Sequence, residues 1–140
     1  MKVDIKNDCA GVDWKKVSEI LKYAGMAYHV PDAHRRAFEA SYTSVFVYHA
    51  DRLIGFGRAI SDGIYQAAIY DCAVLPEFQG KGIGTKIMKN ILPRISHCNV
   101  ILYASPGKEG FYQKHGFRKM KTGMARFKEG VAMSDRGFTE

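Results

Sequence analysis

The segment that most constrains the fold of this chain is an apolar strand that runs through a glycine-rich turn into a helix. It reads Asp71-Cys72-Ala73-Val74-Leu75-Pro76-Glu77-Phe78-Gln79-Gly80-Lys81-Gly82-Ile83-Gly84-Thr85. Glycines in such a turn let backbone N–H groups approach a ligand closely, and the helix N-terminus adds partial positive charge. Lys81 adds a full positive charge. The turn therefore predicts a cradle for an anionic group.

The spacing of these glycines separates the cradle from two familiar nucleotide-binding motifs. A P-loop needs Gly-x-x-x-x-Gly-Lys followed by Ser or Thr, and the dinucleotide fingerprint needs Gly-x-Gly-x-x-Gly. This turn has Gly-x-Gly-x-Gly, which disfavours ATP and NAD as ligands. A tight strand-to-helix connection that binds nothing is the alternative that the turn alone leaves open.

Composition indicates a single globular domain of 140 residues with an anionic partner. Hydrophobic residues make up 46% of the chain and charged residues 25%, which is enough apolar material for a core. The formal net charge of +7 fits nucleic acid, an acidic membrane or a phosphorylated small molecule. Lysines and arginines are spread along the whole chain and no RNA or DNA motif is present, so nucleic acid is disfavoured.

Cysteine usage and hydropathy predict a cytoplasmic protein. The three cysteines, Cys9, Cys72 and Cys98, are odd in number and have no metal-ligand spacing, which disfavours a disulfide framework and a zinc site. The five histidines form no pair with metal-ligand spacing and have no serine or cysteine partner nearby in sequence. No apolar leader opens the chain, and no apolar run reaches the roughly 20 residues of a membrane span. We expect no metal and no membrane association.

The order of elements predicts an α+β fold around one mixed, mostly antiparallel sheet flanked by helices. Helices are expected over residues 14–24 and 32–42, and strands over 44–48, 53–60 and 64–75. A helix from residue 80 is expected to stop at Pro93, followed by a strand over 99–104, a short helix over 108–115 and one or two strands over 117–127. The tail from residue 128 to residue 140 is expected to be loose.

Two motifs of this chain, one in the glycine-rich turn and one after the next strand, resemble the signatures of the GNAT superfamily of N-acetyltransferases. Gln79, Gly82 and Gly84 match the first signature, which is Gln or Arg, two residues, Gly, one residue, then Gly or Ala. The run Phe111-Tyr112-Gln113-Lys114-His115-Gly116-Phe117 is similar to the second, an aromatic-Tyr pair on a short helix before Gly-Phe. The resemblance extends over roughly residues 2–127 and implies the GNAT fold.

The resemblance implies acetyl-CoA as the acyl donor. In this family the glycine-rich loop binds the pyrophosphate of coenzyme A, and the preceding strand hydrogen-bonds the pantetheine arm through its backbone. The implied coenzyme-binding residues are Cys72, Ala73, Val74, Gln79, Gly80, Lys81, Gly82, Ile83, Gly84, Thr85, Ser105 and Phe111. Ser105 replaces an asparagine of the family. Transfer is direct in this family, so Cys72 is expected to be a small buried hydrophobe.

Acetyl transfer to an amine requires a neutral amine and a proton for the departing thiolate. By resemblance Tyr112 donates that proton, since a phenol with a pKa of about 10 is protonated at neutral pH. A structural tyrosine beside Phe111 and Phe117 is the alternative. Asp71 is the only carboxylate on its strand and is the candidate base, although the family often carries a glutamate three residues earlier, where this chain has Ala68. An amine-binding anion and a hydrogen-bonded aspartate are the alternatives for Asp71.

The expected function is acetylation of a primary amine on a small molecule or a peptide, whose identity the sequence leaves open. The resemblance implies that residues 25–31 help to line the acceptor site, and an ordinary surface loop is the alternative. Family members are often dimers, so a homodimer is compatible with the resemblance. The alternative function is a non-catalytic module of the same fold that binds coenzyme A or nucleic acid.

Overall fold

The computed structural model describes all 140 residues, which divide into two compact units, residues 1–102 and 103–140. The first unit contains β1 (Asp4–Lys6), α1 (Trp14–Tyr23), α2 (Pro31–Glu39), β2 (Thr43–His49), β3 (Arg52–Ser61), β4 (Gln66–Val74), the 3₁₀ turn η1 (Pro76–Phe78), α3 (Ile83–Arg94) and β5 (Asn99–Ile101). The second contains α4 (Glu109–Gln113) and α5 (Gly130–Asp135). The single domain predicted over residues 1–140 stays a prediction.

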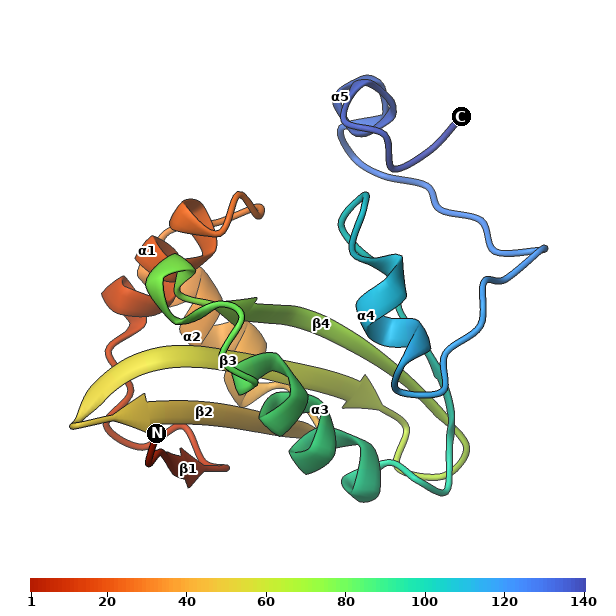
Figure 1. The fold of residues 1–140 in the computed structure, drawn as a ribbon. Helices are drawn as coiled ribbons and strands as arrows, with labels where there is room; N and C mark the ends of the chain where they lie inside the picture. The colour runs from red at the N-terminus through yellow and green to blue at the C-terminus, as the bar shows by residue number, and fades with distance from the viewer. The chain divides into compact units, whose positions relative to one another are not determined.

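One mixed sheet with the strand order β1-β2-β3-β4-β5 forms the centre of the first unit. The pairs from β1 to β4 are antiparallel, and β4 and β5 are parallel. Helices α1 and α2 pack together on one face of the sheet, and α3 crosses the other face (Figure 1). This arrangement confirms the predicted α+β class with a mostly antiparallel sheet.

Helix α1 has the ends that its sequence predicts. Asp13 caps its N-terminus, because Oδ1 accepts hydrogen bonds from the N–H groups of Lys15 at 3.1 Å and Lys16 at 3.2 Å. Gly25 follows the helix with a φ of 76°, the left-handed conformation that commonly ends a helix. Its buried residues, Val17, Ile20 and Leu21, recur at the helical period and face the sheet.

Two turns fix the register of the three central strands. The β2–β3 turn consists of Ala50 and Asp51, whose φ angles of 48° and 63° suit a type I′ hairpin. In the turn before β4, Asp62 Oδ1 accepts hydrogen bonds from the amides of residues 64–66 at 2.8, 2.9 and 3.1 Å. These bonds hold the pKa of the Asp62 carboxyl below its usual range. Because residues 64 and 65 belong to this turn, β4 begins two residues later than predicted.

An aromatic cluster fills the space between the sheet and the α1–α2 layer. The Phe38 ring of α2 lies 5.6 Å from the Trp14 ring, 5.4 Å from Phe46 and 5.7 Å from Phe56, measured between ring centroids. Buried aromatic pairs contribute about 0.5–1.5 kcal/mol each beyond the area that they bury. The cluster joins both N-terminal helices to β2 and β3.

Helix α3 approaches the opposite face closely because β3 carries two glycines there. A Cβ atom added at Gly57 would lie 2.8 Å from Cys72 Sγ and 3.0 Å from Ile87 Cγ2. One added at Gly55 would lie 3.1 Å from the Ala73 carbonyl oxygen. Any larger residue at position 57 would therefore push α3 away from the sheet.

The C-terminal part of the chain differs from the prediction. Residues 117–127 contain no strand, whereas one or two were predicted there. Four cations interrupt this stretch, and only Phe117 and Phe127 at its ends are sheltered from solvent, so no apolar face is available to bury. The tail that was predicted to be loose contains α5, which Gly137 ends with a φ of 86°.

Smaller corrections concern four other elements. Pro93 does not stop α3, which continues to Arg94, because a proline in the last turn removes only one helical hydrogen bond. The second helix begins at Pro31 and ends at Glu39, three residues earlier than predicted, and β5 covers only Asn99–Ile101. The three-residue strand β1 was not predicted, since so short a run carries no clear periodicity.

None of the helices has the length and apolar character needed to cross a bilayer.

Candidate functional site

The loop between η1 and α3 leaves its backbone amides uncovered. Gly80 and Gly82 have φ angles of 76° and 82°, and a Cβ atom at either would meet nothing within 4 Å. The Lys86 amide is bonded to the Gly82 carbonyl at 3.1 Å, so the amides of the preceding turn lack partners within the helix. No side chain caps this end of α3. The loop thus offers several N–H donors and a helix dipole to an anion.

Two side chains of the loop have different surroundings. Gln79 turns back toward β4, where its Nε2 donates to the Val74 carbonyl at 3.0 Å. This bond ties the loop to the end of the strand. Lys81 lies with its ammonium 5.5 Å from the centroid of the Phe78 ring, which Arg52 also approaches at 5.6 Å. Gln79 therefore positions the loop, and Lys81 supplies positive charge beside it.

Strand β4 has an edge that is only half paired. It pairs with β3 along most of its length, but with β5 only over residues 66–68. Residues 69–74 have no strand partner on the second edge, and this free edge ends directly before η1 and the loop. Backbone groups on such an edge are available to an extended ligand, as in β-augmentation. Cys72, Ala73 and Val74, which the sequence predicted for coenzyme binding, lie here.

Asp71 lies at a β-bulge in the same strand. Its φ of 54° is left-handed, a conformation that Asp adopts more readily than most other residues with a side chain. Asp71 Oδ2 accepts a hydrogen bond from Arg58 Nε at 2.7 Å, and the two side chains are only 24% and 17% exposed. The carboxylate predicted as a base is thus engaged in a shielded ion pair, which matches the hydrogen-bonded alternative.

The Arg58 guanidinium is held on several sides. It lies 5.6 Å from the centroids of the Phe38 and Tyr70 rings, and Nη1 donates to Ser41 Oγ at 3.3 Å. Ser41 Oγ in turn donates to the Ala37 carbonyl at 2.8 Å. The ion pair therefore connects α2 and the start of β2 with β3 and β4.

Sequence reasoning missed Arg58, although the sequence carries a signal for it. Arg58 is the only charged residue in the interior of the strand predicted over residues 53–60, and Asp71 is the only one in the next strand. Opposite charges isolated on adjacent apolar strands are expected to pair, because a buried charge needs a partner.

A buried histidine anchors the loop between α1 and α2, which the sequence predicted to line the acceptor site. His34 is 3% exposed, and its Nε2 accepts a hydrogen bond from the His29 amide at 2.8 Å. Burial lowers the pKa of His34, so the neutral ring is favoured. Ser18 Oγ donates to the His29 carbonyl at 2.5 Å. On this loop Tyr28 and Val30 remain 49% and 70% exposed.

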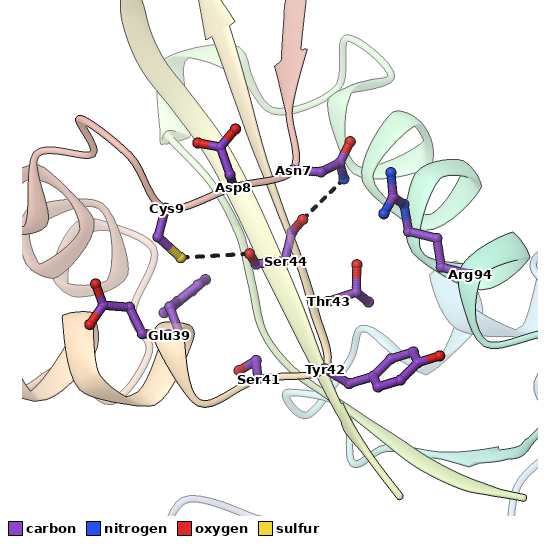
Figure 2. A pocket seen from close by; sticks show the side chains of 10 residues that line it. Asn7, Asp8, Cys9, Glu39, Ser41, Tyr42, Thr43, Ser44 and Arg94 are labelled. Atoms are coloured by element: carbon purple, nitrogen blue, oxygen red, sulfur yellow. Dashed lines mark hydrogen bonds between the residues drawn. The ribbon is translucent and has the colours of Figure 1, made fainter. Parts of the chain in front are cut away.

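A polar pocket of about 330 Å³ lies where the end of α2 and the start of β2 meet the N-terminal segment and Arg94 of α3 (Figure 2). Cys9 Sγ approaches Ser44 Oγ at 3.8 Å across this pocket. No residue predicted for the site lines it. Ser41 belongs both to the pocket wall and to the Arg58 cluster.

The second unit carries the residues of the other signature. On α4 the Tyr112 ring lies 5.1 Å from the Phe111 ring and 6.0 Å from the Phe117 ring. Gly116 has a φ of 89°, and the Phe117 amide donates to the Tyr112 carbonyl at 3.2 Å, which confirms the predicted helix cap. Ser105 precedes α4, and its carbonyl accepts a hydrogen bond from an amide in the turn that leads into the helix.

The first unit thus brings together the loop, the free edge of β4 and the Arg58–Asp71 pair. Ser105, Phe111 and Tyr112 lie in the second unit. Cys72 is half-buried, and burial raises the pKa of its thiol to about 12. No group of three or more His, Cys, Asp or Glu side chains is arranged to hold a metal ion.

The family and the relatives that this chain resembles are all described as acetyltransferases. The acetyltransferase (GNAT) domain family matches residues 15–135. An uncharacterized ycf52-like N-acetyltransferase of Prochlorococcus marinus is 32% identical over 113 residues, 76% of this chain and 63% of that protein. Serotonin N-acetyltransferase 2, chloroplastic, of Oryza sativa subsp. japonica is 29% identical over 120 residues, 81% of this chain and 60% of that protein. The chain spans less than two thirds of the length of these two relatives.

A solved structure gives the same result for the fold. The crystal structure of a protein of unknown function from methicillin-resistant Staphylococcus aureus, described as a probable acetyltransferase, superposes with a TM-score of 0.83 at 29% identity. The superposition covers 91% of this chain and 99% of that one.

Proposed function

The chain belongs to the GNAT family of acetyltransferases, and from this premise we propose that it transfers an acetyl group from acetyl-CoA to a primary amine. One observation carries the proposal: the open loop of uncapped amides stands directly beyond the half-free edge of β4. An elongated ligand with a phosphate group next to an amide-containing arm would satisfy both features. Acetyl-CoA has this chemistry.

In this proposal the coenzyme's phosphates bind at the loop, and its arm lies along β4. Gly80, Gly82 and the first turn of α3 supply N–H donors, and Lys81 supplies charge. The backbone of residues 72–74 hydrogen-bonds the arm, and Gln79 holds the loop against the strand end. The open space above both glycines supports this fit. Ser105 and Phe111 are proposed as further contacts on the strength of the resemblance.

The reaction proposed is a direct transfer. The amine nitrogen forms a bond to the thioester carbon, the carbon–sulfur bond breaks, and the sulfur leaves as a thiolate. Tyr112 would give its phenolic proton to that sulfur and regain one from solvent. The proton lost by the amine goes to water. Asp71, the base that the sequence suggested, is given no part in this step, because Arg58 already engages its carboxylate.

The acceptor is proposed to be a primary amine that reaches the β4 strand past the loop over residues 25–30. Tyr28 and Val30 on this loop expose apolar surface, which would suit an amine with an apolar or aromatic body. The rice relative is named for serotonin. Serotonin therefore belongs in an acceptor screen, together with a polyamine and a lysine-containing peptide, so that aromatic, polycationic and peptide amines are all represented.

The first test is a calorimetric titration with acetyl-CoA on the intact chain and on Gly82→Asp. The aspartate adds bulk and negative charge to the cradle, so we expect affinity to fall by about 100-fold or more. Gly11→Asp is the matched control, because Gly11 also has a positive φ, 71°, and open space around it. That variant should bind acetyl-CoA as the intact chain does.

Release of free thiol in the presence of each amine then tests catalysis. Binding of acetyl-CoA without thiol release from any acceptor would favour the non-catalytic module. No binding by the intact chain would refute the proposal. Salt-dependent retention of DNA or RNA on a filter would favour the nucleic-acid alternative instead.

A further inference from the structure

The side chains of β4 change their alternation at Asp71. Tyr70 lies on the α2 side of the sheet, because its cross-strand partner Arg58 lies over both the Tyr70 ring and the Phe38 ring of α2. In a regular strand the next side chain would turn to the α3 side. Asp71 instead stays on the α2 side, where it accepts the hydrogen bond from Arg58 Nε at 2.7 Å.

The bulge also changes the face of the sheet on which the later side chains of β4 lie. Residues 71 and 72 of β4 together lie opposite Gly57 of β3. The Cys72 thiol points to the α3 side, because a Cβ atom at Gly57 would lie 2.8 Å from Cys72 Sγ and 3.0 Å from Ile87 of α3. A shift of one residue reverses the faces of all later residues in a strand. The bulge therefore sets the orientation of Cys72, Ala73 and Val74.

A regular register would be unfavourable for this sequence. It would turn the Asp71 carboxylate toward the space beneath α3, which buried side chains such as Ile87 and Ile91 fill. An unpaired carboxylate in apolar surroundings is strongly disfavoured. In the bulged register the carboxylate meets Arg58, which two aromatic rings and Ser41 hold in place. The ion pair thus stabilises the bulge at which Asp71 takes its left-handed backbone conformation.

We infer that Arg58 is a positioning residue for the coenzyme strand: through its ion pair with Asp71 it holds β4 in the bulged register. The register determines which backbone groups of residues 72–74 point to the free edge. The inference rests on the proposed function, since this orientation matters for binding only if the coenzyme arm lies along β4. In this role Arg58 contacts no reacting atom, and Asp71 is its anchor and not a base.

Steady-state kinetics with an acceptor found in the screen test the inference. Arg58→Ala and Asp71→Ala should each raise the KM for acetyl-CoA by about tenfold or more and change kcat by less than about threefold. The double variant should be no worse than either single one, because both remove the same ion pair. Arg35→Ala is the matched control. Like Arg58, Arg35 forms ion pairs, here with Asp32 and Glu39, but its side chain is 43% exposed on α2. Its KM should stay within about twofold of the original value.

Asp71→Asn separates positioning from general-base catalysis. Asparagine accepts the Arg58 hydrogen bond and tolerates a left-handed backbone, so it should restore the KM for acetyl-CoA and leave the shape of the pH–rate profile unchanged. A loss of kcat by about 100-fold together with loss of the acidic limb of the profile would overturn the inference in favour of the base. If Arg58→Ala does not fold, the comparison of Asp71→Ala with Asp71→Asn carries the same test.

A second readout needs no coenzyme. In a background of Cys9→Ser and Cys98→Ser, alkylation of Cys72 by iodoacetamide is followed by mass spectrometry under native conditions. The intact register keeps this thiol against Gly57 with a pKa of about 12, so it should react slowly. Arg58→Ala should raise its rate by about tenfold or more, and Arg35→Ala should not.

The two readouts distinguish the possible failures. If the intact chain binds no acetyl-CoA, the proposed function fails while the Cys72 rate still reports on the register. If it binds acetyl-CoA and Arg58→Ala binds it equally well, with the Cys72 rate unchanged, the inference alone is refuted.

Discussion

The two units of the chain hold their candidate residues by different means. Every buried hydrophobic side chain lies in the first unit, between Val12 and Ile95. Neither helix of the second unit has a buried residue, and its order comes from ring contacts such as those of Tyr103 with Phe127 at 5.3 Å and Phe138 at 5.9 Å. Changes at the buried positions of the first unit should therefore affect folding, and changes in the second unit should affect chemistry or local order.

The largest effect is expected where the first unit is packed most tightly. Gly57→Val should lower the free energy of unfolding by about 3 kcal/mol, because its side chain would overlap Cys72 and Ile87. Urea titration followed by circular dichroism measures this value. Gly130→Val in α5 is the matched control, since nothing lies within 4 Å of a Cβ there. Equal losses from both variants would show that packing does not distinguish the units.

The next effect concerns chemistry in the second unit. Tyr112→Phe removes only a hydroxyl and keeps the ring contacts with Phe111 and Phe117. If Tyr112 is the proton donor, kcat should fall by about 100-fold while the affinity for acetyl-CoA stays the same. Tyr65→Phe, at a tyrosine 61% exposed in the first unit, is the control. Unchanged turnover in Tyr112→Phe would assign this tyrosine a structural role.

A smaller, pH-dependent effect should arise in the first unit from His34. Burial lowers its pKa from the ordinary value near 6.5, an effect that the nearby charges of Arg58 and His29 reinforce and that of Asp71 opposes. Below about pH 6.5 the unfolded chain binds a proton that the folded chain does not, so the free energy of unfolding falls with decreasing pH, by up to about 1.4 kcal/mol per unit. Urea titrations at pH 7 and pH 5 measure the loss.

His34→Gln is the comparison for that measurement. Glutamine offers an oxygen to the His29 amide but does not titrate, so the variant should lose less stability between the two pH values than the original chain. The same pH dependence in both proteins would show that other groups cause it.

The smallest effect is expected from the ring contacts of the second unit. Phe138→Ala removes the contacts with Tyr103 at 5.9 Å and Phe127 at 6.4 Å, which are worth about 1 kcal/mol together. Limited proteolysis should cut the segment after residue 128 faster, with no change in the urea midpoint of the first unit. A shift of that midpoint would show that the Phe138 ring contacts also affect the stability of the first unit.

The sequence predicted the first unit well because its signals are local. Asp13 and Gly25 mark the ends of α1, and the glycine-rich turn lies between a strand and a helix as expected. The bulge at Asp71 could not be predicted, since it depends on an ion pair with Arg58, thirteen positions away. A strand pattern in the sequence predicts that successive side chains point to opposite faces of the sheet, but it does not show where a bulge interrupts this alternation.

Prediction was poorer toward the C-terminus for a related reason. Strands over residues 117–127 were predicted around the turn dipeptide Thr122-Gly123, without evidence of a partner strand. A strand is stable only when another strand and an apolar face complete it. Helix α5 was missed because six residues are too few to show a helical period. The ring contacts of Phe138, which follows this helix in the chain, with Tyr103 and Phe127 join residues far apart in the sequence and cannot be read from a local pattern.

The half-paired edge of β4 makes the stability of the folded chain depend on whether a ligand is bound there. An unpaired strand edge is a template for association with other chains. A ligand that binds only the folded state raises its stability, by about 2.7 kcal/mol at a concentration 100 times the Kd. A coenzyme arm seated along residues 72–74, as proposed, would supply hydrogen bonds to this edge and cover part of the template at the same time. If the proposed coenzyme binds there, the amount of folded chain would rise and fall with the supply of that coenzyme.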